Sequence, residues 1–203
     1  MRVEVGAPHA AVTSAVTEPM RTRTRLPKRL VEHLILSGTL DGSGVGAPIN
    51  IASGTPVNVG NNQFIVLNGT INNQGTIALN SVANLTDMII GASGAILQGG
   101  GAITLSNSTQ NRIYSNTAGA VFENVDNTIS GAGHVFTNAG LSLINTGTGT
   151  WIAGTVSFIN NASFTNTETG TFDDQVDGTF GGNGSDCPVF TNQGHFVKSG
   201  GMG

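Results

Sequence analysis

The 203-residue chain contains 30 glycines, while only 10% of its residues are charged and 5% are aromatic, which excludes the Lys-, Glu- and Leu-rich periodicity of a helical protein. The net charge is −4, and residues 42–203 hold two basic against eight acidic side chains. Such an acidic body is poorly suited to bind nucleic acid through its phosphates. The recurring Ile, Val, Phe and Leu also distinguish the chain from a disordered Gly/Ser linker.

The N-terminal region concentrates the positive charge. Six of the eight basic residues lie in residues 1–41, and residues 21–29 read RTRTRLPKR. This run could bind nucleic acid or an anionic membrane, but a solvated lead-in is favoured. The apolar stretch that follows is short and is interrupted by Glu32 and His33, so it does not resemble a signal peptide. No stretch approaches the roughly 18 apolar residues of a membrane-spanning helix.

The chain is predicted to consist of a weakly structured lead-in and a single domain. Residues 1–41 form a basic lead-in that is irregular or serves as a cap, and residues 42–203 form a β-solenoid repeat domain. Within the lead-in, residues 30–36 are expected to form a short strand or a helical turn that covers the first coil. Solenoids need such caps, because an open end exposes both the apolar core and unpaired strand edges.

A four-residue phrase recurs along the chain and marks β-strands. VFEN at 121–124 returns as VFTN at 135–138 and 189–192, and as SFTN at 163–166. Asn-x-Gly occurs at 73–75, 138–140 and 192–194. Gly and Asn accept the left-handed backbone conformation of sharp turns, so the pattern reads strand, tight turn, strand. Repetition of this unit predicts stacked β-coils.

The alternation of apolar and small polar residues predicts which side chains face the core. Residues 64–80 and 94–107 alternate with period two. The inward side chains are expected to be Ile71, Ile77, Leu79, Ile96, Ile103 and Leu105. At about 20 residues per coil, residues 45–200 would make roughly seven or eight coils.

Side chains at equivalent positions of successive coils are expected to stack. Eight of the nine Phe residues occur from Phe122 onward, and aromatic rings in register would fix the alignment of the coils. The turn asparagines would form hydrogen-bonded ladders between coils. The Asn residues expected in such ladders are Asn124, Asn138, Asn166 and Asn192.

Residues 99–145 contain the most distinctive motifs of the chain. These are NRI at 111–113, NVDNTI at 124–129, GAG at 131–133 and LSLIN at 141–145. With these motifs the segment resembles the repeats of large bacterial exoproteins, the haemagglutinin-like and autotransporter passenger proteins, and residues 45–200 resemble them more loosely. The resemblance implies a right-handed parallel β-helix at or released from the bacterial surface, acting in adhesion. It brings no catalytic residues.

A β-helix polysaccharide-degrading enzyme is the first alternative. Pectin-degrading enzymes carry Asn-x-Asp, an Asp pair and Gly-His-Gly, which NVD at 124–126, Asp173-Asp174 and Gly194-His195 partly resemble. Asp126, Asp173 and Asp174 would then act as acid and base in glycoside hydrolysis. However, Asp126 is expected about two coils, or near 10 Å, from Asp173, and the second Gly and an Arg-x-Lys are missing. We therefore expect no catalytic residues.

A calcium site is the second alternative. GGNGSD at 181–186 matches the start of a calcium-binding nonapeptide, and Asp173, Asp174 and Asp177 could add oxygen ligands. A single copy cannot complete the coordination shell, because such sites take ligands from consecutive turns, so a solvated acidic loop is favoured. The lone Cys187 excludes an intrachain disulfide and is read as structural. The histidines, which lack metal-ligand spacing, are His9, His33, His134 and His195. No metal or cofactor is expected.

The sequence thus predicts a non-catalytic structural or adhesive module of a bacterial surface or secreted repeat protein. A rigid rod would present polar Thr, Ser and Asn faces to glycans or to host or bacterial surfaces. A gene fragment without independent function is the remaining alternative, and its exposed ends would promote end-to-end self-association.

Overall fold

The computed structural model describes residues 34–35, 37–44, 48–137, 140–158, 161–182 and 188–202. Within these ranges the structure is all-β, its strands pair in parallel, and no α-helix occurs. The strands are β1 (Leu34–Ile35), β2 (Gly38–Gly42), β3 (Ile49–Ile51), β4 (Pro56–Gly60), β5 (Phe64–Asn73), β6 (Thr76–Asn80), β7 (Thr86–Gln98), β8 (Ala102–Leu105), β9 (Asn111–Ser115), β10 (Val121–Asn124), β11 (Thr128–Thr137), β12 (Ser142–Asn145), β13 (Thr148–Phe158), β14 (Ser163–Asn166), β15 (Thr171–Asp174), β16 (Phe180–Gly182), β17 (Val189–Asn192) and β18 (His195–Val197).

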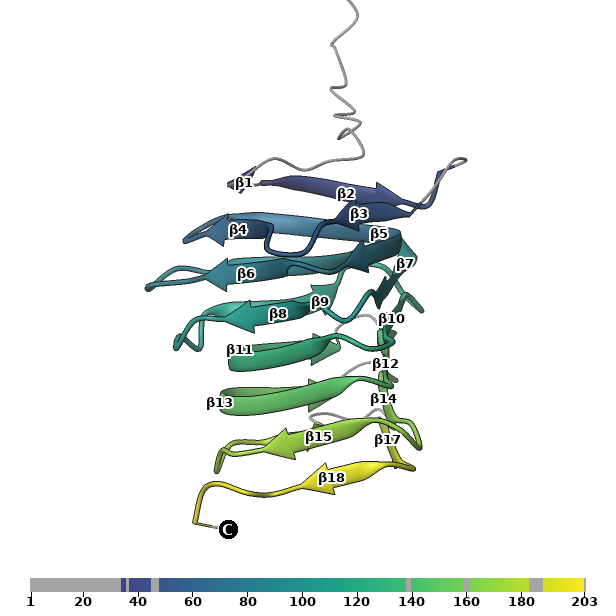
Figure 1. Ribbon diagram of the computed structural model, residues 1–203. Coiled ribbons are helices and arrows are strands. Elements are labelled where there is room, and N and C mark those ends of the chain that lie inside the picture. The colour runs from purple at the N-terminus through teal and green to yellow at the C-terminus, as the bar shows by residue number, and fades with distance from the viewer. Residues whose placement is uncertain are drawn as a thin grey trace, which may run out of the picture.

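The strands stack on three faces of a β-solenoid (Figure 1). The first face contains β1, β4, β6, β8, the first parts of β11 and β13, β15 and β18. The second contains β2, the first parts of β5 and β7, β9, the second parts of β11 and β13, and β16. The third contains β3, the second parts of β5 and β7, β10, β12, β14 and β17. The predicted all-β parallel solenoid is confirmed.

The coils are longer than predicted. Along the first face, the aligned residues are Pro56, Thr76, Ala102, Thr128, Thr148, Thr171 and His195. The step between neighbours ranges from 20 residues (Pro56 to Thr76) to 26 residues (Thr76 to Ala102). The solenoid therefore makes about six turns, instead of the seven or eight that a uniform coil of about 20 residues would give.

The solenoid begins before residue 42. β1 pairs with β4, and β2 pairs with β5, so paired strands start at Leu34. The strand alternative predicted for residues 30–36 therefore holds for Leu34 and Ile35. The rest of the basic lead-in, through residue 33, lies outside the described residues. In the described part of the chain, no helix is long and apolar enough to cross a membrane.

The core follows the predicted alternation, with one exception. Five of the six side chains predicted to face inward are buried: Ile71, Ile77, Leu79, Ile103 and Leu105. The prediction for Ile96 is wrong, because its side chain is 38% exposed while Ala95 and Leu97 are buried. Gly94, with a φ of 69°, turns the chain from the second face to the third. This left-handed residue interrupts the alternation and reverses which side chains face the core.

Aromatic stacking is confirmed in the last coils. The rings of Phe164 and Phe190 occupy aligned positions with centroids 5.3 Å apart, and those of Phe172 and Phe196 lie 6.0 Å apart and nearly parallel. Phe122 is also buried, but its aligned neighbours on β7 and β12 are Ala95 and Leu143. Among the described ring pairs the aromatic stack therefore lies in the C-terminal part of the core, and most of the other described core side chains are aliphatic, with Phe122 and Trp151 as exceptions.

An asparagine ladder runs through the interior at the end of the third face. The Nδ2 of Asn124 donates to Asn145 Oδ1 (2.9 Å), Asn145 to Asn166 (2.9 Å), and Asn166 to Asn192 (2.8 Å). Asn124, Asn145 and Asn166 are almost completely buried. The predicted ladder is confirmed for Asn124, Asn166 and Asn192, with Asn145 as an unpredicted member. Asn138 lies outside the described residues.

Candidate functional site

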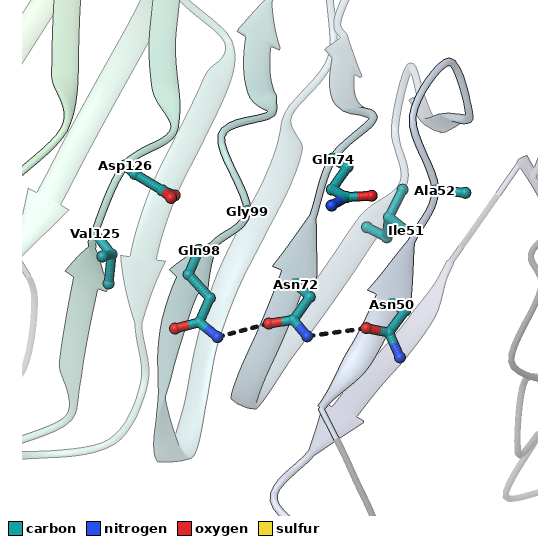
Figure 2. A pocket seen from close by; sticks show the side chains of 9 residues that line it. All are labelled: Asn50, Ile51, Ala52, Asn72, Gln74, Gln98, Gly99, Val125 and Asp126. Atoms are coloured by element: carbon teal, nitrogen blue, oxygen red, sulfur yellow. Dashed lines mark hydrogen bonds between the residues drawn. The ribbon is translucent and has the colours of Figure 1, made fainter.

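An open groove of about 570 Å³ lies where the third face turns into the first. Its walls come from four successive coils, at the ends of β3, β5, β7 and β10 and in the turns that follow them. Figure 2 shows its lining residues, which are Asn50, Ile51, Ala52, Asn72, Gln74, Gln98, Gly99, Val125 and Asp126. Most of these side chains are amides or small residues, and none is aromatic.

A row of amides connects three coils along the groove (Figure 2). Gln98 Nε2 donates to Asn72 Oδ1 at 2.7 Å, and Asn72 Nδ2 donates to Asn50 Oδ1 at 2.9 Å. The Nδ2 of Asn50 then donates to the carbonyl oxygen of Pro48 at 3.3 Å. The two bonds that join the coils, from Gln98 to Asn72 and from Asn72 to Asn50, point in the same direction along the solenoid axis. The row therefore has an acceptor, the Oε1 of Gln98, at its other end.

Asp126 supplies the only charge in the lining of the groove. Its Oδ1 accepts hydrogen bonds from the backbone N–H of Gly100 (2.9 Å) and from Asn127 Nδ2 (3.1 Å). The side chain is exposed, and the bond from Gly100 connects the turn after β10 to the turn of the preceding coil. Asp126 thus adds carboxylate acceptors beside the acceptor end of the amide row.

Gly99 allows the backbone to pass close to the preceding coil at the groove. Its φ is 112°, and a Cβ added there would lie 2.8 Å from the carbonyl oxygen of Asn73. A side chain at this position would also be in a strained conformation. The groove therefore has a glycine at a position where a larger residue would disturb both the turn and the packing of the coils.

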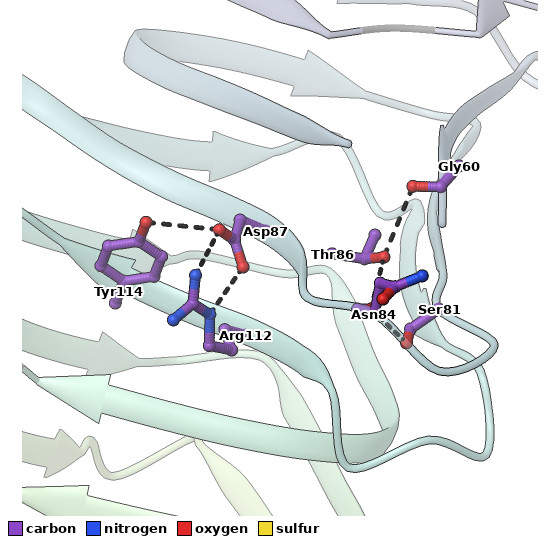
Figure 3. A network of polar contacts seen from close by, with 7 residues as sticks. All are labelled: Gly60, Ser81, Asn84, Thr86, Asp87, Arg112 and Tyr114. Carbon is purple, nitrogen blue, oxygen red and sulfur yellow. Dashed lines mark hydrogen bonds and ion pairs between the residues drawn. The ribbon is translucent and has the colours of Figure 1, made fainter. Parts of the chain in front are cut away.

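A second polar cluster lies on the outer side of the second face (Figure 3). Arg112 on β9 donates through Nε and Nη2 to both carboxylate oxygens of Asp87 on β7, at 2.7 and 2.6 Å, and the hydroxyl of Tyr114 donates to Asp87 at 3.3 Å. The side chains of Arg112 and Asp87 are 26% and 13% exposed. The guanidinium also lies 4.9 Å from the centre of the Tyr114 ring.

The electrostatics of this cluster indicate a structural role. The hydrogen bond to Asp87 raises the pKa of Arg112 despite partial burial, and burial raises the pKa of Tyr114. Burial, and then the nearby Arg112, lower the pKa of His134, which is aligned with Arg112 in the next coil. Because the bidentate pair joins two neighbouring coils and its charges neutralise each other, the cluster acts as a clamp between coils.

The structure does not bring the predicted enzyme residues together. Asp173 and Asp174 are consecutive on β15, with Asp173 partly exposed and Asp174 buried, so their side chains lie on opposite sides of the strand. Asp126 precedes Thr128, and Thr171 is two coils further along the same face. Two coils correspond to about 10 Å along the axis. The three carboxylates therefore do not face a common point.

Asp173 also has hydrogen-bond partners that keep it ionised. It accepts from Gln175 Nε2 (2.7 Å), from Ser199 Oγ (2.7 Å) and from the backbone N–H of Ser199 (3.2 Å). The hydrogen bonds from Gln175 and then Ser199 lower the pKa of Asp173. A general acid in glycoside hydrolysis needs the opposite change.

The carboxylates considered for calcium have separate partners. Asp177 accepts from the backbone N–H of Met202, at 2.9 and 2.8 Å for its two oxygens, while Asp174 accepts from Val176 N at 3.4 Å. In the ranges that the structure describes, no three His, Cys, Asp or Glu residues form a group that could hold a metal ion. Residues 183–187, which include most of the Gly-rich motif and Cys187, lie outside those ranges.

Sequence reasoning missed the groove, although it named Asp126. Asn50 and Asn72 are 22 residues apart, whereas Asn72 and Gln98 are 26 residues apart, and neither spacing matches a coil of 20 residues. A search for amides that directly follow the last inward apolar residue of a third-face strand would have found Asn72 after Ile71 and Gln98 after Leu97. No family model, no curated protein and no solved structure matches the chain.

Proposed function

We propose that this protein is a non-catalytic structural or adhesive module of a bacterial surface or secreted repeat protein, and that its amide-lined groove binds glycans. The observation that carries the proposal is the row Gln98, Asn72 and Asn50, which presents amide groups of three successive coils along one open groove. The surface location rests on the resemblance of residues 99–145 to bacterial exoprotein repeats.

The chemistry of the groove favours a neutral ligand with many hydroxyl groups. Gln98 and Asn72 each use one side-chain N–H to donate to the next amide of the row, and Asn50 uses one to donate to the carbonyl oxygen of Pro48. A primary amide has a second N–H that can donate to a ligand. Gln98 Oε1 and Asp126 can accept from a hydroxyl group. A sugar hydroxyl both donates and accepts, so it can satisfy both kinds of group. The carboxylate of Asp126 would repel an anionic glycan.

The groove also suggests weak binding by each module. It is open, and its lining contains no aromatic side chain on which a sugar ring could stack. Most tight small-ligand sites are enclosed and largely apolar. An adhesive rod can compensate through multivalency, because several linked modules raise the effective concentration of each site.

The carboxylate arrangement gives no support to the enzyme alternative. Asp126, Asp173 and Asp174 do not converge, and the pKa of Asp173 is lowered. A binding role needs only the fixed positions of the amides, which the ladders between coils provide.

The test is a titration of the protein with a panel of neutral and sulfated oligosaccharides, followed by the same titration of two variants. Asn72→Ala removes the middle of the amide row and should weaken binding about fivefold to tenfold, the effect of losing roughly one hydrogen bond. Asn80→Ala is the matched control, because Asn80 donates to Asn58 across the same 22-residue step but lies outside the groove. Equal affinities of Asn72→Ala and Asn80→Ala for a bound glycan would show that the groove is not the site. Absence of binding to every glycan would contradict the proposed function.

A further inference from the structure

The groove at the corner between the third and the first face has a gap in the middle of its lining. Gly99 has no side chain, and it is flanked in the groove by Gln74 of the preceding coil and Asp126 of the following coil. Figure 2 shows Gln74 and Asp126 on the two sides of Gly99, with the carboxylate of Asp126 directed toward the glycine. A group of a bound ligand that enters this gap can therefore contact the carboxylate.

The carboxylate of Asp126 has one oxygen available for such a contact. Its Oδ1 accepts from the backbone N–H of Gly100 and from Asn127 Nδ2, whereas Oδ2 has no hydrogen-bond partner among the described residues. Gln74 is exposed, and its side-chain amide likewise makes no hydrogen bond to any residue that the structure describes. The bonds to Oδ1 hold the carboxylate in place, while Oδ2 and the amide of Gln74 can bind a ligand.

No cation of the described residues offsets the charge of Asp126. The only arginine and lysine in the described ranges are Arg112 and Lys198, which form ion pairs with Asp87 (2.6 Å) and Asp177 (3.6 Å). The first pair lies on the second face and Lys198 follows β18, so neither pair belongs to the groove. A positively charged group of a ligand therefore gains an ion pair in the groove without displacing a described side chain.

We propose that the groove prefers glycans whose sugars carry a free amino group, such as oligomers of glucosamine, because the protonated amine pairs with Asp126. This inference rests on the proposed glycan binding and specifies the class of ligand. An ammonium group only donates hydrogen bonds, which suits the free Oδ2, and its charge adds an attraction that a hydroxyl group lacks. The ring hydroxyl groups of the same ligand bind the amides, as those of a neutral glycan do. An acetylated amine is uncharged and loses the ion pair.

The test compares three β-1,4-linked oligosaccharides of equal length that differ at one position of each sugar. They are a glucosamine oligomer, its N-acetylated form and a glucose oligomer, which carry an amine, an acetamide and a hydroxyl group at that position. Isothermal titration calorimetry is performed at low salt and at a mildly acidic pH, where the sugar amines are protonated and carboxylates are ionised. We expect the glucosamine oligomer to bind about fivefold more tightly than either neutral oligomer, the effect of one ion pair exposed to solvent. This preference should decrease at high salt.

Two variants assign the preference to Asp126. Asp126→Asn removes the charge and keeps an oxygen that can accept from Gly100, so it should lower the affinity for the glucosamine oligomer about fivefold and leave that for the neutral oligomers within about twofold. Unchanged binding of the neutral oligomers shows that the variant is folded. Glu168→Gln is the matched control, because Glu168 is exposed in the turn after β14, at the same corner of a later coil but outside the groove. It removes an equal charge and should leave all three affinities unchanged.

The outcomes distinguish this inference from the proposed function. Equal binding of the three oligomers would overturn the preference for an amine and leave glycan binding by the groove intact. A preference that Asp126→Asn retains, or that Glu168→Gln lowers equally, would also overturn it, because the attraction would then come from the overall negative charge of the protein. Absence of binding by all three oligomers would contradict both the inference and the proposed function.

Discussion

The interior asparagine ladder is expected to contribute more to stability than any surface ladder of the molecule. Asn145 is 3% exposed, accepts from Asn124, and donates to Asn166 Oδ1 (2.9 Å), Thr171 O (3.1 Å) and Gly147 O (3.2 Å). Asn145→Ala removes these bonds and leaves a buried acceptor on Asn166 without its donor.

The size of the effect follows from these contacts. Each lost bond between neutral groups costs about 1 kcal/mol, and a buried group left unsatisfied costs about 1–3 kcal/mol. Asn124 keeps its second bond, to the carbonyl oxygen of Asn127, so only one side of the ladder is fully disrupted. We therefore expect Asn145→Ala to lower the free energy of unfolding by about 3 kcal/mol.

Urea denaturation followed by circular dichroism measures this change. Asn80→Ala is the control, because the exposed Asn80 makes only long bonds of 3.3 and 3.4 Å at the surface. It should change the free energy of unfolding by less than about 0.5 kcal/mol. The slope of the free energy against urea must be compared as well, since a changed slope would indicate a loss of cooperative unfolding. If Asn145→Ala and Asn80→Ala have equal effects, the ladder does not hold the coils together as described.

Three further predictions concern other parts of the solenoid. Asp87→Asn removes the charge that pairs with Arg112 and should lower the free energy of unfolding by about 1 kcal/mol. The effect should be smaller at high salt, because the pair is partly exposed to solvent. An equal decrease in the free energy of unfolding at low and high salt would contradict this prediction. Because the pKa of His134 is lowered in the folded protein, the unfolded chain binds the proton more readily, and the free energy of unfolding should decrease as the pH falls through about 6.5. Urea titrations at several pH values should show that His134→Gln reduces this decrease. Trp151 is buried, and no described residue accepts a hydrogen bond from its Nε1. Trp151→Phe should therefore keep the melting temperature within the few degrees that about 1 kcal/mol represents, and a much larger drop would reveal an acceptor for the indole.

The period-two pattern was sufficient to predict the inner side of most strands. Ile77 and Ile103 lie in strands with uninterrupted alternation, and both are buried. Ile96 was misplaced because Gly94 adopts a left-handed conformation within a strand that continues around a corner. A glycine in a sequence does not show which sign of φ it adopts, so the reversal of the alternation could not be predicted.

The repeated four-residue phrase correctly predicted an asparagine ladder, but it did not predict on which face of the solenoid each copy lies. The copies at 121–124, 163–166 and 189–192 lie in β10, β14 and β17 on the third face. The copy at 135–138 begins in the second part of β11, on the second face. Asn145 completes the third-face ladder from a strand that reads SLIN, without the aromatic residue of the phrase.

The groove could not be predicted because it depends on the alignment between coils. Its amides are separated by 22 and 26 residues, and the length of each coil is determined by the loops at its corners. Because the loops differ in length, the residue that lies beside a given side chain in the next coil cannot be found by counting a fixed number of residues along the sequence. Asp126 was identified from a motif, but its neighbours in space, Gly100 and the amide row, became apparent only from the fold.

The most direct test of glycan binding in the groove is a titration monitored through the side-chain amide signals of the protein in a nitrogen–proton correlation spectrum. Asn50, Asn72 and Gln98 line the groove, whereas Asn145 and Asn166 belong to the buried ladder and provide an internal control. We expect a neutral oligosaccharide to shift the three groove amides in a saturable manner while the two ladder amides remain unchanged. Saturable shifts that map elsewhere, or the absence of any shift with the whole glycan panel, would contradict the account.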